Sequence, residues 1–482
     1  MADLNGSLTP RPARSRSLLA PLAFTRATGQ ARPGYTLAVA TDARRALANA
    51  WLALGLVALI TAGVLSVLLV ASRTPGLQSV FPGTDFFRVA LVAHVDLSVL
   101  VWFLAFAGVL WTVNSTSRAM GVAWVAFGLA AAGTAAIALA PFFGQGRPVM
   151  ANYIPVLRDP WFLTGLVVFA GGVALLVLRA MATVPLVGIR IDGAGALRFG
   201  LNASLVSAAV ALIAFGWSYY AVPASLGPAA YYELLFWGGG HVLQFTWTLL
   251  MLVAWLLLAE AIGARVPLTP RVTALLFGIG LVAVFITPVI YLAYDVGSVE
   301  HHRLLTWIMQ FGGGLAIPPV ALAVLWALFR QGRIESELRP LRAAVVTSIV
   351  LFGVGGLIGF MIHGSNVKIP AHYHGCIVGV TVALMGLAYQ LLPSLGFARP
   401  AVRLATLQPY LYGAGQLLHI AGLVWSGGYG VQRKVAGGEQ VLHTTEEIVG
   451  MGLMGLGGLV AVAGGVLFVF VVLQAIWRAR RR

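Results

Sequence analysis

Charged side chains are scarce in this sequence of 482 residues. Asp, Glu, Lys and Arg together make up only 10% of it, whereas hydrophobic residues make up 59%. A typical soluble domain carries about 25% charged residues, so this chain lacks the polar surface that water requires. Cysteine is almost absent as well, since Cys376 is the only one. A single cysteine excludes intrachain disulfides, iron–sulfur clusters and the C-x-x-C-H attachment of a c-type haem. The composition therefore predicts a protein embedded in a membrane.

Acidic residues are few compared with basic ones, 15 against 31, which gives a formal net charge of +16. In a soluble protein this excess would indicate a nucleic-acid partner, whereas in a membrane protein Lys and Arg gather in cytoplasmic loops. Residues 1–46 are rich in Arg, Pro, Ser and Thr and contain no long apolar run and no evident signal peptide. We interpret them as a disordered, basic cytoplasmic tail. Membrane lipid is expected as a partner, and nucleic acid is not.

Long apolar runs follow this tail. Twelve of them are long enough to cross a hydrocarbon core, because a helical span needs about 20 residues. The sequence thus predicts an all-α, polytopic membrane protein whose twelve-helix domain covers residues 47–478. The predicted spans are 48–71, 86–112, 119–143, 160–181, 200–222, 231–262, 272–294, 303–329, 342–363, 371–397, 406–427 and 448–477.

The basic residues set the orientation of these spans. With the N-terminus inside, 23 of the 31 basic residues fall on the inner side. This asymmetry predicts that both termini are cytoplasmic in a multi-pass protein of a bacterial-type inner membrane. The eight cations on the outer side are Arg73, Arg88, Arg147, Arg158, Arg303, Lys368, Arg433 and Lys434.

Six of the nine histidines share one depth in this topology. At a rise of about 1.5 Å per residue, all six fall in the outer half of the membrane. A single intramembrane histidine can serve a simple interhelical hydrogen bond, but six at a common depth indicate a functional site. Imidazole is the commonest metal-binding side chain and a frequent ligand of haem iron. The six are His94, His241, His301, His302, His372 and His374.

Spacing divides these histidines into groups. His372 and His374 are two residues apart on one helix, so they face nearly opposite directions and can hold two cofactors on opposite sides. His94 is then left to pair with one of these two across a haem. His301 and His302 are adjacent at the start of a span and can converge on one ion. A third imidazole, that of His241, would complete a three-histidine site of the kind that suits copper.

The combined pattern resembles the catalytic subunit of the haem–copper oxidase superfamily. The shared features are twelve spans, a histidine in the second and in the sixth, a His-His pair before the eighth and a His-x-His motif in the tenth. Residues 94–100 and 370–375 are most similar to the branch that contains the C-family (cbb-type) cytochrome oxidases and the nitric oxide reductases. The resemblance implies two haems, usually of b type, and one copper or non-haem iron.

The resemblance also implies a role for each histidine. His94 and His374 would be the axial ligands of a six-coordinate low-spin haem, and His372 would be the proximal ligand of a high-spin haem. The second metal would be held by His241, His301 and His302. Anionic haem propionates face outward in this superfamily, so outer cations are expected to contact them. The candidates are Lys368, Arg433 and Lys434.

The activity implied by the resemblance is terminal respiratory electron transfer. Electrons would pass from the low-spin haem to the haem–copper centre, which would reduce O2 to water as cytochrome c oxidases do. A nitric oxide reductase, which converts 2 NO to N2O, would use the same ligand set. A non-catalytic membrane protein that senses gases through haem or metal is a further alternative. The electron donor is expected to be a cytochrome c, a cupredoxin or a quinol, together with a small redox subunit.

The residues that separate O2 chemistry from NO chemistry depart from the family pattern. The larger oxidase families carry a tyrosine four residues after the first copper histidine, where standard nitric oxide reductases carry a glutamate, and the residue here is Phe245. C-family oxidases carry the tyrosine six residues before the His-His pair, and that position is Asp295. Tyr294 lies one residue out of register and favours the oxidase. The remaining polar candidates are Tyr291, Gln244, Asp295 and Glu300.

Overall fold

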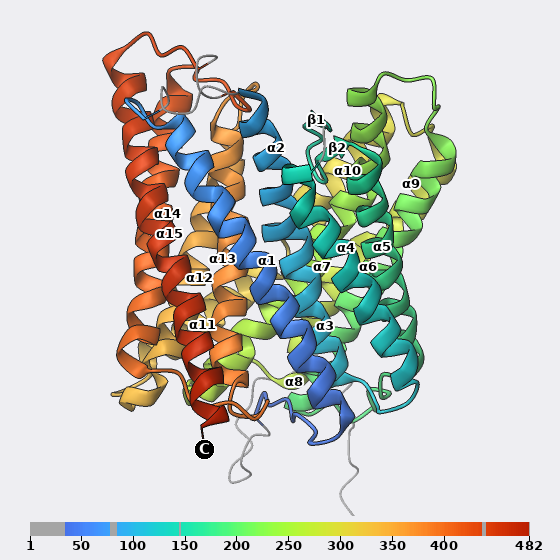
Figure 1. The fold of residues 1–482 in the computed structure, drawn as a ribbon. Coiled ribbons are helices and arrows are strands. Elements are labelled where there is room, and N and C mark those ends of the chain that lie inside the picture. Colours follow the sequence, from blue (N-terminus) through green and yellow to red (C-terminus); the bar gives the residue numbers. More distant parts are fainter. Residues whose placement is uncertain (1–33, 78–83, 144–145, 436–439, 482) are drawn as a thin grey trace, which may run out of the picture.

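The computed structural model describes residues 34–77, 84–143, 146–435 and 440–481, which form one bundle of long helices (Figure 1). The first helix begins and the last helix ends at the same end of the bundle. A short β-hairpin lies at the opposite end, which we call the hairpin end. The basic tail predicted for residues 1–46 falls largely outside the described residues, and its last four residues already belong to the first helix, α1, which begins at Ala43 after the capping residue Asp42.

The elements follow the predicted runs closely. In chain order they are α1 (Ala43–Arg73), α2 (Thr84–Val95), η3 (Asp96–Val101), α3 (Trp102–Asn114), α4 (Met120–Phe143), β1 (Arg147–Val149), β2 (Val156–Arg158), α5 (Pro160–Thr183), α6 (Gly193–Ala221), α7 (Pro228–Ala261), α8 (Pro270–Val282), η4 (Ala283–Ile286), α9 (Thr287–Ala293), α10 (Val299–Trp307), η5 (Ile308–Gly312), α11 (Ile317–Arg330), η6 (Ser336–Leu338), α12 (Arg339–Gly359), α13 (Lys368–Leu391), α14 (Val402–Gly428) and α15 (Thr445–Arg480).

Within the described residues, eleven helical segments are long and apolar enough to cross a membrane. Several segments combine consecutive elements, such as Phe87–Asn114 from α2, η3 and α3. The twelfth predicted run, 406–427, is also a continuous helix of 27 residues, α14. Its polar side chains, which include the buried Gln408, Gln416 and His419, make it less apolar than the others. The predicted all-α, polytopic fold is therefore confirmed.

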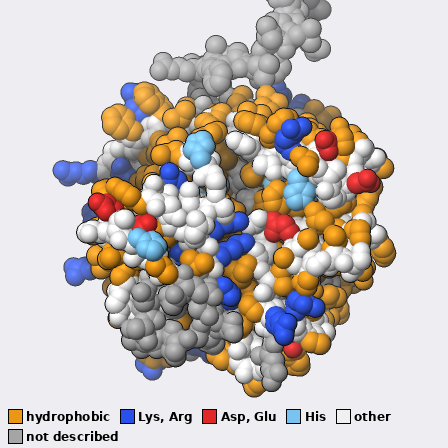
Figure 2. All heavy atoms as spheres, turned by 90° about the horizontal axis from the view of Figure 1, so that it is seen from above, with side chains coloured by type: hydrophobic (Ala, Val, Ile, Leu, Met, Phe, Trp, Pro, Cys, Tyr) orange, Lys and Arg blue, Asp and Glu red, His pale blue; other side chains and the backbone are white. Residues whose placement is uncertain are grey.

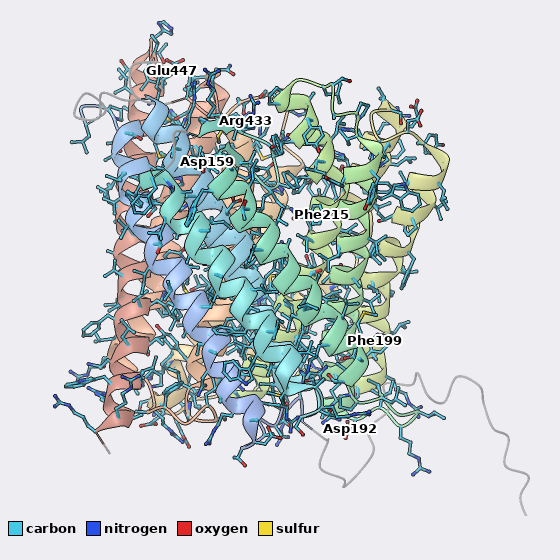
Figure 3. All side chains as sticks on the ribbon, turned by 45° about the vertical axis from the view of Figure 1, so that its right-hand side comes forward. Asp159, Asp192, Phe199, Phe215, Arg433 and Glu447 are labelled. Atoms are coloured by element: carbon cyan, nitrogen blue, oxygen red, sulfur yellow. The ribbon has the colours of Figure 1, made fainter. Side chains whose placement is uncertain are left out.

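Side chains at the ends of the helices satisfy backbone N–H groups that no helical carbonyl can reach. Asp159 accepts a hydrogen bond from Phe162 N at 3.1 Å, and Asp192 accepts one from Gly195 N at 2.7 Å. Figure 3 shows the two aspartates at opposite ends of the bundle. Glu447 and Thr444 form a capping box at the start of α15. These caps fix where the spans begin.

Glycines bring particular helices into backbone contact, as is common in membrane bundles. A Cβ atom at Gly355 of α12 would clash with the backbone nitrogen of Cys376 in α13. A Cβ atom at Gly422 of α14 would clash with the backbone nitrogen of Met454 in α15. Any larger side chain would therefore force these helices apart. The close approach fixes α12 against the histidine-bearing helix α13 and α14 against α15.

The hairpin end carries most of the irregular structure. Strands β1 and β2 pair in antiparallel fashion, with Val149 opposite Val156, so residues 150–155 form their connecting loop. Two π-helical turns, η3 and η5, follow the predicted ligand segments of the second and eighth spans. Such turns redirect side chains and are frequent at functional sites. Seen from this end, hydrophobic side chains form most of the rim, and Lys and Arg side chains gather near the middle (Figure 2).

Candidate haem and metal centre

A cavity of about 630 Å³ lies below the hairpin, among α1, α2, α7, α13, α14 and α15. Its volume falls within the range of about 300–1,000 Å³ that cofactor and ligand pockets occupy. His94 from α2 and His374 from α13 both line it. The fold thus brings together two histidines that are 280 positions apart in the sequence. These are the two residues that the sequence resemblance assigns to one haem.

Each of these two imidazoles is held by a hydrogen bond through Nδ1. His94 Nδ1 lies 2.9 Å from the carbonyl oxygen of Ala62, and His374 Nδ1 lies 3.3 Å from Oε1 of Gln416. A carbonyl oxygen can only accept, so Nδ1 carries the proton and donates. Nε2 is then the nitrogen with a free lone pair. This arrangement is typical of histidines that bind iron or another metal.

His372 faces a different helix from His374. Its Nδ1 donates to the carbonyl oxygen of Gly355 in α12 at 2.7 Å, and the residue is absent from the wall of the cavity. Gly359, one turn further along α12, makes room for the ring, because a Cβ atom there would lie 3.0 Å from it. Helix α13 therefore separates two imidazole environments, one toward α14 and one toward α12.

The remaining three predicted ligands lie on α7 and α10. His241 is 1% exposed and His301 is fully buried, whereas His302 is half-buried. The sequence predicts the His-His pair at the start of a span that begins at residue 303, and α10 begins slightly earlier, at Val299. Ser298 caps this helix by accepting the backbone N–H of His301 at 3.2 Å. The pair therefore lies in the first helical turn, where the backbone is fixed.

Trp237 lies between two of these ligands. Its ring stacks on His302 with centroids 4.4 Å apart and planes inclined by 17°, and it lies 4.6 Å from the ring of His241. The indole N–H donates to the carbonyl oxygen of His302 at 3.2 Å. In turn, Nδ1 of His241 donates to the carbonyl oxygen of Trp237 at 2.7 Å. Aromatic packing thus holds both imidazoles beside the indole.

Three imidazole nitrogens in this region are buried without a hydrogen-bond partner. They are Nδ1 and Nε2 of His301 and Nε2 of His302. Buried polar atoms are nearly always satisfied, so three such atoms at adjacent residues call for a ligand. In the part of the chain that the structure describes, no three His, Cys, Asp or Glu side chains already lie close enough to hold an ion. A shared metal would require these rings to reorient.

Two of the predicted tyrosines occupy different environments. The hydroxyl of Tyr291 is 2.8 Å from Oγ of Ser218, and its ring lies edge-on to His301 at a centroid distance of 4.7 Å. Tyr294 follows the last residue of α9 in extended conformation, with φ −138° and ψ 139°, and its side chain is 40% exposed. The structure therefore brings Tyr291 to one of the predicted metal ligands, His301, and directs Tyr294 away from it.

Tyr153 approaches the same centre from the hairpin loop, although it is not among the candidates predicted from the sequence. Its ring centroid is 4.7 Å from that of His241, and it also lines the cavity that His94 and His374 share. Gly240 permits the contact, because a Cβ atom there would clash with the tyrosine ring. Burial raises the pKa of the Tyr153 hydroxyl well above its ordinary value, and nearby Tyr373 and Glu233 raise it further. No local sequence signal marks this residue, because the hairpin brings it in.

The other polar candidates are dispersed. Gln244 lines the same cavity as His94 and His374, whereas Asp295 and Glu300 are exposed at the hairpin end. Phe245, at the position of the family tyrosine or glutamate, is 1% exposed. Lys368 begins α13 and packs against Gly427, outside the cavity wall.

Three cations line the cavity, and two of them are predicted propionate contacts. Arg433, labelled in Figure 3, donates from Nε to Oγ of Ser365 at 3.3 Å. Lys434 donates to the carbonyl oxygen of Met150 and to Oδ1 of Asn152. The third cation is Arg73, one of the eight outer cations, which donates from Nε to Oε1 of Gln440 at 3.1 Å. Guanidinium and ammonium groups at one end of a cavity suit a carboxylated ligand.

Lys434 has an unusual backbone conformation and an unusual pKa. Its φ of 63° lies in the left-handed region, which residues other than glycine seldom adopt. Burial lowers the pKa of its ammonium group to about 8, to which nearby Arg433 contributes, while Glu233 acts in the opposite direction. Backbone strain of this kind persists only where surrounding contacts enforce it, and it clusters at ligand clamps and active sites.

Comparison with known proteins agrees with this geometry. The family model described as cytochrome c and quinol oxidase polypeptide I matches residues 46–472. The chain belongs to this family. Uncharacterized protein RP382 of Rickettsia prowazekii (strain Madrid E) is 30% identical over 496 residues, covering 88% of this chain and 95% of that protein. An uncharacterized protein of Aquifex aeolicus (strain VF5) is 29% identical over 351 residues, covering 72% and 85% respectively.

Membership of the cytochrome c and quinol oxidase family makes the chain a multi-pass membrane protein with haem–copper oxidoreductase-type activity in electron transport. Members typically bind haem and copper. Both sites fit such groups. The cavity offers the pre-oriented imidazoles of the two predicted ligands and three cations, and the region of α7 and α10 offers unsatisfied imidazole nitrogens.

Proposed function

We propose that this protein is a terminal oxidase that reduces O2 to water. The arrangement of α13 carries the proposal, because His374 faces the cavity that His94 also lines, while His372 bonds to α12 and lies outside the wall of that cavity. Two haems, of b type by the sequence resemblance, would be held at these two positions. The copper, or a non-haem iron, would be held by His241, His301 and His302.

The side chains of this chain position the cofactors and manage protons. When bound, the haem and metal pair supplies the electrons for the reduction of O2. Arg433 and Lys434 would neutralise the carboxylates of the haem in the cavity and keep them at the hairpin end. The Nδ1 hydrogen bonds of His94 and His374 keep each Nε2 directed at its ligand, which lowers the reorganisation that binding requires.

Tyrosines in contact with the metal ligands support O2 as the substrate. Reduction of O2 to water needs four electrons, and a phenol can supply one of them together with a proton. Tyr291 lies against His301, and Tyr153 lies against His241. A proton that leaves Tyr291 would pass to Oγ of Ser218 at 2.8 Å, and Ser218 would release its own hydroxyl proton in turn. Tyr291, rather than the exposed Tyr294, is therefore the proposed donor on this side.

Nitric oxide reduction is the second candidate, and Glu233 is the observation that favours it. Its carboxylate accepts hydrogen bonds from the backbone N–H of Asn152 at 3.0 Å and from the Asn152 amide at 2.5 Å. The same carboxylate interacts electrostatically with His302. A carboxylate near a metal ligand resembles the environment that NO reductases create with glutamate. Conversion of 2 NO to N2O takes two electrons, so it does not need the tyrosines.

Electrons would enter at the hairpin end, which we place outside the cytoplasm with both termini inside. The basic side chains near the middle of this end offer a surface for a donor of opposite charge (Figure 2). A cytochrome c, a cupredoxin or a quinol is the proposed donor, acting with a small redox subunit. The bacterial-type inner membrane and the disordered cytoplasmic tail also belong to this proposal.

Turnover with both gases on one preparation tests the proposal. The purified full-length protein is assayed aerobically with O2 and anaerobically with NO, and haem, copper and iron are counted in the same sample. O2 consumption well above that of free haem, with two haems and one copper, would support the oxidase. Turnover of NO alone would establish the second candidate. Bound haem without turnover of either gas would favour the gas sensor, and absence of haem would refute all three.

A further inference from the structure

A third imidazole faces the haem cavity, and the proposed function gives it no role. His419 of α14 is 7% exposed and lines the same cavity as His94 and His374. A low-spin haem has two axial positions, so three imidazoles exceed what it can bind at one time. The additional histidine lies on a helix that contributes none of the six predicted ligands.

The ring of His419 is held in the same way as the rings of the predicted ligands. Its Nδ1 donates to the carbonyl oxygen of Met454 at 2.9 Å, which leaves the lone pair of Nε2 free. His94 and His372 show the same arrangement, with Nδ1 on a backbone carbonyl at 2.9 and 2.7 Å. His374 instead depends on the amide oxygen of Gln416 at 3.3 Å, a longer contact to a flexible side chain.

His419 and His374 occupy neighbouring positions on the wall of the cavity. Their ring centroids are 4.5 Å apart, with planes inclined by 55°. Helix α15 makes room for this placement through glycines. A Cβ atom at Gly457 would clash with the backbone nitrogen of His419, and one at Gly458 would lie 3.2 Å from its Nδ1. The position of His419 therefore depends on two consecutive residues without side chains.

We propose that His419 is an alternative axial ligand of the haem in this cavity and takes the position of His374 when that residue leaves. The proposal rests on the proposed function only in requiring a haem between His94 and His374. In the exchange, Nε2 of His374 would release the haem iron and Nε2 of His419 would hold it instead. No electron or proton is gained or lost, because both imidazoles bind as neutral donors through the same nitrogen.

The exchange gives this site a property that a two-histidine site lacks. Loss of His374 leaves the haem with an imidazole on each side, so the haem stays six-coordinate and low-spin. The two states differ in the group that accepts the Nδ1 proton, which is a side-chain amide for His374 and a backbone carbonyl for His419. Because such partners tune the basicity of a ligand, the haem in the two states differs in its reduction potential.

Four variants of the full-length protein test this assignment: His374→Ala, His419→Ala, the double variant His374→Ala/His419→Ala, and His443→Ala as a control. His443 is exposed in the last loop at the hairpin end. Haem is counted for each, and the ferric low-spin signal is recorded by electron paramagnetic resonance. The signal is expected to persist in both single variants, with shifted g values in His374→Ala. In the double variant it is expected to fall about tenfold or more.

Imidazole added to the double variant is expected to restore the low-spin signal, which distinguishes a missing ligand from unfolding. The proposal is wrong if His374→Ala alone becomes high-spin or loses its haem, if the double variant stays low-spin, or if added imidazole restores nothing. A wild-type protein without haem would instead overturn the proposed function, so the two failures are distinguishable.

Discussion

The cavity lined by His94 and His374 and the three-histidine region of His241, His301 and His302 share the hairpin end of the bundle but hold their imidazoles differently. In the cavity, His94, His374 and His419 each have Nδ1 engaged and face open space of about 630 Å³. In the other region, aromatic rings fill the space between the imidazoles, and nitrogens of His301 and His302 have no partner. The cavity is therefore an open site whose imidazoles are already oriented. The three-histidine region is closed, because side chains fill it, and its imidazoles lie apart.

This difference bears on how each cofactor is bound. A haem that enters the cavity meets ligands already in place, so little of its binding energy goes into ordering them. A metal between α7 and α10 must draw together His241, His301 and His302 against the packing of Trp237 and Tyr291. Metal binding there is therefore coupled to a local rearrangement. We expect the second metal to be lost before the haem when the protein is challenged with a chelator.

We expect the largest effect from the removal of His94, the proposed haem ligand that has no second histidine to replace it. His94 is the cavity histidine contributed by α2, and no neighbouring imidazole takes its place in the way that His419 does for His374. We expect His94→Ala to abolish the low-spin signal and to lower haem affinity more than about 100-fold. Haem counting and electron paramagnetic resonance measure this. Retention of a full low-spin signal would show that another group can replace His94 as a ligand, as His419 is proposed to replace His374.

Next in size is the effect of His301→Ala on the closed region. This fully buried side chain carries two unsatisfied nitrogens. We expect the second metal and turnover to be lost, turnover by more than about 100-fold, while the low-spin haem stays unchanged. Metal analysis measures the loss of the second metal, and the optical spectrum of the same sample measures the low-spin haem. Simultaneous loss of the low-spin haem would show that the regions are not independent.

A smaller effect is expected from Tyr291→Phe. The change removes the hydroxyl that pairs with Ser218 and leaves the ring against His301. We expect O2 turnover to fall about 100-fold if the phenol supplies a proton and an electron, with a loss of only about 1 kcal/mol of stability. Tyr294→Phe is the matched control, because that side chain is 40% exposed. A larger loss in Tyr294→Phe than in Tyr291→Phe would reverse the assignment.

The depth of the histidines could be predicted from the sequence, whereas their neighbours could not. Depth follows from the rise of a helix, which is the same for every residue and places His94, His241 and His374 at one level. The opposite directions of His372 and His374 follow from helical rotation. Contacts between helices depend on which helix faces pack together. Glycines such as Gly355 and Gly457 determine that packing, because they let particular helices approach closely.

Residues at the ends of elements are the hardest to place from sequence. Tyr294 is expected near the metal, but α9 ends at Ala293, so the backbone becomes extended and the side chain faces outward. The contact of Tyr153 with His241 is not predictable, because it depends on a hairpin whose two short strands give almost no periodic signal. The sequence also gives no sign that the carbonyl oxygen of Met454, on another helix, orients the ring of His419.

The smallest expected effect concerns the charge at the mouth of the open cavity. Burial lowers the pKa of Lys434 to about 8, with Arg433 and Glu233 acting in opposite directions, so its ammonium group loses its charge as the pH rises from 7 to 9. A haem carboxylate then loses one cationic partner. We expect haem dissociation to accelerate about three- to tenfold over this range, measured by transfer to an excess of an acceptor protein. Lys434→Arg keeps its charge and should abolish the dependence on pH.

The stability of the protein without haem should respond to pH in the opposite direction. An unfolded lysine has a pKa of 10.5, so between about 8 and 10.5 the unfolded chain binds more protons at Lys434 than the folded chain does. The contribution of this group to the free energy of unfolding therefore rises with pH in that window. Denaturation of the wild type and of Lys434→Arg at pH 7 and 9 measures it. If haem retention and apoprotein stability both fell with pH, the cause would be general unfolding, and Lys434 would not be the anchor of the haem.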